Sequence, residues 1–157
     1  MADFALPPDL KHNRGLIDDP AAFASDFGAE SWLFLCGEAF ADMDGGMSFA
    51  QVQAAVPTAE NIVSDPPTVF DLDRVRALVA ALDDLPRPTL GTCRTGPRSS
   101  AVAYVHAGLQ AGASADDVLA RADADEAPFA ASEDLRALVR QALEGGADPE
   151  GRVRAQP

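Results

Sequence analysis

Blocks of apolar residues alternate with polar and turn-forming residues along this chain, and their spacing predicts helices separated by short strands. Helices are predicted at residues 21–26, 49–56, 72–85, 99–109, 114–121 and 132–143. Strands are predicted in the short apolar runs at residues 32–36, 60–64 and 88–92. This order favours an α/β domain with a mostly parallel central sheet and helices on both faces. We expect the domain to span residues 1–146 and residues 147–157 to form a flexible polar tail.

Local signals mark the ends of several of these helices. Capping residues are expected at the starts, namely Asp19, Ser48, Ser114 and either Asp71 or Asp73. Gly112 is expected to end the helix over residues 99–109, because glycine readily adopts the left-handed conformation found after helices. The boundaries of the helices are therefore better defined than those of the strands.

Composition and charge restrict the class of partner. The 157 residues, 47% of them hydrophobic, fit one domain with a sizeable core, and no run approaches the ~18 apolar residues needed to span a bilayer. The first residues lack a basic segment followed by an apolar core, so we expect no export signal, a cytoplasmic location and no membrane partner. A formal net charge of −13 argues against a nucleic-acid partner. An anion site must then be a local focus of positive charge, and Arg94 with Arg98 provides one.

The cysteines and histidines predict neither a disulfide framework nor a metal site. The chain has two cysteines and two histidines, and their spacing does not fit a set of metal ligands. We therefore expect no metal and no cofactor. Cys36 ends a predicted buried strand and is interpreted as a core residue, with a resolving thiol for Cys93 as the alternative. His106 is predicted to pack inside its helix instead of acting as a base.

The segment from Cys93 to Ser100 carries the clearest chemical signal. It joins a predicted strand to a predicted helix, so its backbone N–H groups and the helix N-terminus are expected to form an anion cradle. The same field favours the thiolate of Cys93, which is the nucleophilic form. Arg98 presents a planar set of donors suited to an oxyanion. A loop with a purely structural role is the alternative, because a lone cysteine after a strand is often a small core residue.

This region resembles the active site of the beta-lactamase-hydrolase-like phosphatase-like family, bacterial relatives of the dual-specificity and tyrosine phosphatases. In that family a sequence of the form Cys-Arg-[Ser/Thr]-Gly-x-Arg-Ser closes the phosphate-binding loop, and here Cys93 to Ser99 match it. The resemblance extends from about Val69 to Ala122, roughly a third of the chain. It implies a cysteine-phosphatase-like fold and thiolate attack on a phosphoryl group.

The residues of this segment can be given roles on these grounds. Cys93 is the expected nucleophile, and Arg98 is expected to bind the oxyanion and balance charge in the transition state. The remaining loop residues are expected to contact substrate or complete the cradle of amides: Arg94, Thr95, Gly96, Pro97 and Ser99. The resemblance implies that the Ser99 hydroxyl supports the thiolate, and a helix N-cap is the alternative. Arg94 is expected to face outward, with substrate contact as its alternative.

A phosphatase also needs a proton donor for the leaving oxygen, typically an aspartate from a separate loop. Asp65 is the first choice because it follows a predicted strand, lies in a turn-forming Ser-Asp-Pro-Pro stretch and precedes the cysteine, as in the resembled phosphatases. We expect it to be an exposed turn residue that contributes little to stability. Asp71 and Asp73 are rivals, although a helix cap also explains each of them.

Two other functions stay open. Tyrosine phosphatases have five residues between cysteine and arginine, whereas four separate Cys93 from Arg98. Rhodaneses have the shorter loop, so the spacing favours a sulfurtransferase that carries a persulfide on Cys93. A non-catalytic module that binds an anion is the third possibility. The expected partner is a small anionic substrate, either a phosphate ester or a sulfane-sulfur donor.

Overall fold

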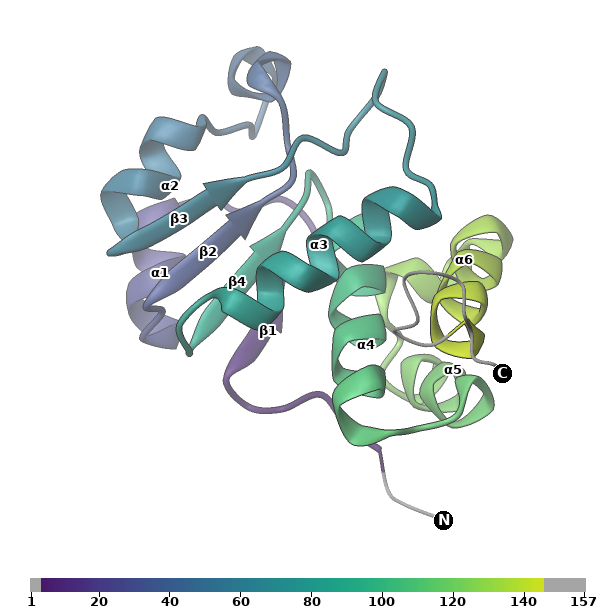
Figure 1. Ribbon diagram of the computed structural model, residues 1–157. Coiled ribbons are helices and arrows are strands. Elements are labelled where there is room, and N and C mark those ends of the chain that lie inside the picture. Colours follow the sequence, from purple (N-terminus) through teal and green to yellow (C-terminus); the bar gives the residue numbers. More distant parts are fainter. Residues whose placement is uncertain (1–3, 146–157) are drawn as a thin grey trace.

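A parallel sheet of four strands forms the centre of the computed structural model, which describes residues 4–145 (Figure 1). The strands are β1 (Leu10–His12), β2 (Ser31–Phe34), β3 (Thr58–Asn61) and β4 (Thr89–Thr92). They lie in the order β1-β4-β2-β3, and Leu33 of β2 is in register with Gly91 of β4. All the pairings are parallel, which confirms the predicted α/β class.

Helices cover both faces of the sheet (Figure 1). Helices α1 (Pro20–Phe27) and α2 (Phe49–Ala55) pack on one face, around Trp32 and Leu90. The other face carries the larger core, around Leu33 and Tyr104. That core is built from the remaining helices, namely α3 (Leu72–Asp84), α4 (Pro97–Ala111), α5 (Ala115–Ala124) and α6 (Glu133–Glu144). Two short 3₁₀ helices complete the described chain, η1 (Glu38–Asp42) and η2 (Pro128–Ala131).

The predicted helix starts agree with the structure. Side chains at four predicted caps accept a backbone N–H from the first turn, namely Asp19, Ser48, Asp71 and Ser114. Ser48 and Gln51 form a reciprocal capping box at the start of α2. Gly112 ends α4 in the left-handed conformation, as predicted.

The strand predictions were less accurate. β3 begins two residues before the predicted segment and ends at Asn61, and β1 was not predicted. α4 begins at Pro97, two residues earlier than expected. The predicted tail at residues 147–157 lies outside the described residues.

The carboxyl ends of the parallel strands meet at one edge of the sheet. Four loops leave this edge, at residues 13–19 after β1, 35–48 after β2, 62–71 after β3 and 93–96 after β4. Ligands of open parallel sheets bind at this edge. Within residues 4–145, no helix is long and apolar enough to cross a membrane.

Candidate active site

The loop after β4 places two amide groups against the sulfur of Cys93. The N–H of Gly96 lies 3.2 Å from Sγ, and the N–H of Ser99 lies 3.4 Å from it. Gly96 has a φ of 113° and lies directly before the first residue of α4, so the sulfur sits at the helix N-terminus. The cradle has one donor fewer than expected, because Pro97 has no N–H.

Glycine is required at position 96. Its φ lies in the left-handed region, and a Cβ there would collide with the carbonyl oxygen of Asn13. A side chain at this position would therefore push the segment after β1 away from the Cys93 loop.

Ser99 lies in the first turn of α4 and contacts the same sulfur. Its Oγ is 3.4 Å from Sγ of Cys93 and donates to Oδ1 of Asn13 at 2.9 Å. The alternative interpretation of Ser99 as the helix N-cap is wrong, since Gly96 occupies that position. The hydroxyl oxygen therefore lies beside the sulfur while its one hydrogen is directed to Asn13, and support of the thiolate by this hydroxyl stays a prediction.

Asn13 holds the loop in place, and the sequence did not single it out. Its side chain is buried and bonds both backbone groups of Cys93: Oδ1 accepts from the N–H at 3.2 Å, and Nδ2 donates to the carbonyl at 2.9 Å. The neighbouring Gly15 N–H donates to the carbonyl of Thr95 at 2.8 Å. The three-residue edge strand β1 therefore serves to bring this asparagine under the loop.

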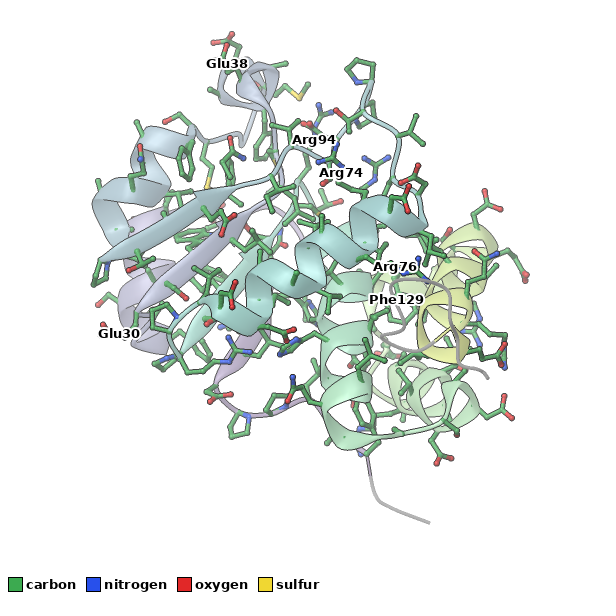
Figure 2. All side chains as sticks on the ribbon, viewed as in Figure 1. Glu30, Glu38, Arg74, Arg76, Arg94 and Phe129 are labelled. Carbon is green, nitrogen blue, oxygen red and sulfur yellow. The ribbon has the colours of Figure 1, made fainter. Side chains whose placement is uncertain are left out.

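Asp65 is buried and paired, which corrects the expectation of an exposed turn residue. It is 5% exposed, and its Oδ2 accepts from Nε and Nη2 of Arg94 at 3.2 and 3.0 Å. Its Oδ1 accepts from the N–H of Gly37 at 3.0 Å. Arg94 does not extend freely outward. It lies between η1 and the segment leading into α3, as Figure 2 shows, and above the ring of Phe40.

Arg98 contacts the same segment as Asp65. Its guanidinium donates to the carbonyl of Ser64 and lies 5.3 Å above the centre of the Phe70 ring. A pocket of about 160 Å³ opens between these groups. It is lined by Asp65, Pro66, Cys93, Arg94, Thr95, Pro97 and Arg98. The structure thus brings the predicted nucleophile, anion receptor and first-choice acid to one pocket.

The rival acids lie elsewhere. Asp71 caps α3 by accepting the N–H of Arg74 at 3.0 Å. Asp71 and Asp73 line a separate hollow with Val69 and Arg74. Of the three candidate acids, Asp65 is the one that lines the pocket of Cys93.

The other singled-out residues are core residues. Cys36 packs with the cluster on the α1 and α2 face, as predicted for a core residue, whereas Cys93 belongs to the opposite cluster. Cys93 nevertheless lies close enough to act on the charge of Cys36, so a resolving thiol stays an alternative. Burial raises the pKa of Cys36, which favours the thiol form. His106 is buried, as predicted, and its Nε2 accepts from Arg87 at 2.7 Å. Within residues 4–145, no group of His, Cys, Asp or Glu is arranged to hold a metal ion.

Comparison with solved structures gives the fold of protein-tyrosine-phosphatase-like enzymes. Tk-PTP in its active form matches with a TM-score of 0.68 at 14% identity, over 92% of this chain and 98% of that chain. A candidate phosphatase of Neisseria meningitidis matches at 0.65 and 20% identity, over 90% and 99% of the two chains. The core catalytic domain of the PP-IP phosphatase SIW14 of S. cerevisiae matches at 0.61 and 16% identity, over 99% and 92%. No family model and no curated protein matches the chain by sequence.

The phosphatase-like fold expected from the Cys93 segment is thereby confirmed. None of these three structures is a sulfurtransferase. Because their identities to this chain are low, the likeness establishes the fold, and activity has to be argued from the site.

Proposed function

We propose that this protein is a cysteine-dependent phosphatase that hydrolyses a small phosphate monoester through a phosphocysteine at Cys93. The observation that carries the proposal is the convergence on one sulfur of two amide N–H groups and the Ser99 hydroxyl, beside a pocket that Arg98 also lines. These donors stabilise negative charge on the sulfur and on the oxygens of a bound phosphoryl group. The phosphatase-like fold supports the same reaction class.

The reaction has two steps. In the first, the Cys93 thiolate attacks phosphorus, an S–P bond forms, the bond from phosphorus to the leaving oxygen breaks, and that oxygen takes a proton from Asp65. In the second, water attacks phosphorus, the S–P bond breaks, and Cys93 leaves as thiolate while Asp65 recovers a proton from the water. Arg98 balances the charge on the equatorial oxygens, after exchanging the Ser64 carbonyl for phosphate.

Arg94 couples substrate binding to the acid. Its guanidinium donates two hydrogen bonds to Oδ2 of Asp65, and both side chains line the pocket. A phosphoryl dianion in that pocket competes for the same donors. When Arg94 turns toward phosphate, Oδ2 of Asp65 becomes free to carry the proton that the leaving oxygen needs.

The test is hydrolysis of an aryl phosphate by the wild type and by the Cys93→Ser and Arg98→Ala variants. We expect slow release of phosphate that is abolished in both variants. Circular dichroism should show both variants folded, because serine is close in size to the buried Cys93 and the side chain of Arg98 is only partly buried.

A thiosulfate-to-cyanide transfer assay on the same preparation separates the rival functions. Thiocyanate formation without phosphate release would assign the site to sulfur transfer, as the four-residue spacing between Cys93 and Arg98 would suggest. Neither product, together with protection of Cys93 from alkylation by inorganic phosphate, would indicate a module that only binds an anion.

A further inference from the structure

The exposed large hydrophobic side chains of the described chain all lie at the edge of the sheet that carries Cys93. Among residues 4–145 they are Leu16, Met43 and Val69, which are 50%, 41% and 69% exposed. Leu16 follows β1, Met43 follows β2 and Val69 follows β3. The Cys93 loop follows β4 at the same edge, and Figure 1 shows the segments after β2 and β3 extending from this end of the sheet.

These residues lie outside the pocket itself, in the loops that follow the neighbouring strands. A Cβ on Gly45 would lie 2.7 Å from Cδ1 of Leu16, so Leu16 packs against the loop that carries Met43. Val69 directly precedes Phe70, whose ring lies against Arg98. The other arginine of the pocket is backed by a ring in the same way, because Arg94 lies 5.9 Å from the centre of Phe40. Each of the two guanidinium groups therefore has an aromatic ring on one side.

The loops at this edge of the sheet carry more negative than positive charge, so we expect them to bind a single phosphate group. The loops at residues 13–19, 35–48, 62–71 and 93–96, together with Arg98 in the first turn of α4, carry three arginines and seven carboxylates. One of the arginines, Arg14, donates to the carbonyls of Asp125 and Glu126, and another, Arg94, is paired with Asp65. Arg74, which lies in the neighbouring hollow, shares it with Asp71 and Asp73. A second phosphate on the substrate would meet carboxylates, and like charges repel.

We propose that the natural substrate is a monophosphate ester of a bulky apolar alcohol; this inference rests on the phosphatase function proposed above. The phosphoryl group occupies the pocket, whose volume of about 160 Å³ is below the ~300–1,000 Å³ that encloses a drug-sized ligand. The apolar group lies outside the pocket, against Leu16, Met43 and Val69. Polyphosphorylated compounds are poor ligands because the edge carries excess negative charge.

The test measures ligand binding without requiring turnover. Methyl-, butyl- and hexylphosphonate and inositol hexakisphosphate are titrated as protectants of Cys93 against iodoacetamide, in the Cys36→Ser protein. We expect hexylphosphonate to bind at least tenfold more tightly than methylphosphonate, because each methylene that leaves water contributes to affinity. We also expect it to bind more tightly than inositol hexakisphosphate.

A rim variant, Leu16→Ser/Met43→Ser/Val69→Ser, serves as the matched comparison. These side chains are exposed, so the protein should fold, and the ratio between hexyl- and methylphosphonate affinity should fall to near one. The proposal would be overturned if hexyl- and methylphosphonate bound equally well to the wild type, or if the rim variant kept the wild-type ratio. Tighter binding of inositol hexakisphosphate than of hexylphosphonate would also overturn it. Aryl phosphate hydrolysis on the same preparation separates the two proposals. Hydrolysis without a chain-length effect leaves the phosphatase standing, whereas absence of both hydrolysis and protection removes the phosphatase and the substrate class together.

Discussion

Replacing Asp65 by asparagine separates the structural role of this residue from its proposed role as proton donor. The amide oxygen of asparagine can still accept from the N–H of Gly37. Its NH₂ group, however, would face the N–H donors of Arg94, which now bind Oδ2 at 3.0 and 3.2 Å. The substitution therefore removes both an ion pair and a titratable proton.

The cost in stability follows from the burial of the pair. Breaking a buried ion pair costs about 3–5 kcal/mol, and an exposed pair contributes about 0–1 kcal/mol. The side chain of Asp65 is 7% exposed, whereas that of Arg94 is 30% exposed, so solvent can take over part of the lost interaction. We expect Asp65→Asn to lower the free energy of unfolding by about 1–3 kcal/mol in urea denaturation.

The catalytic effect should depend on the leaving group. An alkyl phosphate needs its leaving oxygen protonated, so kcat should fall by roughly 10²-fold or more, whereas an activated aryl phosphate should be nearly unaffected. Asp71→Asn is the matched control: asparagine caps a helix as well as aspartate, so stability and both rates should stay near wild type. Equal losses on both substrates in Asp65→Asn would refute its role as acid, and a selective loss in Asp71→Asn would transfer that role to Asp71.

Three further predictions concern other residues. Asn13→Ala leaves the buried N–H and carbonyl of Cys93 without the partners that Asn13 provides, so the free energy of unfolding should fall by about 2–4 kcal/mol and most of the activity should be lost. The control, Asn61→Ala, removes two comparable hydrogen bonds away from the Cys93 loop, so it should lower stability and leave activity unchanged. Burial lowers the pKa of His106 from 6.5 in the folded protein, so the unfolded state binds more protons as the pH falls through this range. The free energy of unfolding should therefore fall between pH 7 and pH 5, and it should fall less in His106→Gln. Iodoacetamide should modify Cys93 before Cys36, whose pKa burial raises; the reverse order, checked by peptide mass mapping, would contradict the site.

Features that depend on neighbouring residues could be predicted from the sequence. The cap at Ser48, the end of α4 at Gly112 and the amphipathic face of α3 all rest on contacts within a few residues. The Cys93 segment belongs to the same group, because a strand, a glycine turn and a helix start follow one another without interruption.

Features that depend on distant contacts could not be predicted. β1 contains one apolar residue, Leu10, between polar residues, and it becomes a strand only by pairing with β4, about 80 residues away in the chain. Asn13 directly follows β1, so it reaches the backbone of Cys93 only because β1 pairs with β4. Asp65 and Arg94 are separated by 29 positions, so their ion pair and the burial of Asp65 follow from the sheet topology, which brings the loops after β3 and β4 to one edge.

The central claim is a covalent phosphoryl group on Cys93, and the most direct measurement is intact mass of the enzyme quenched in acid during turnover of an aryl phosphate. We expect an added phosphoryl group that peptide mapping locates on Cys93 and that is absent in Cys93→Ser. We also expect the adduct to accumulate in Ser99→Ala, because the hydroxyl beside the sulfur helps the thiolate leave. Phosphate release that continues in Cys93→Ser, or a phosphoryl group on another residue, would contradict the account.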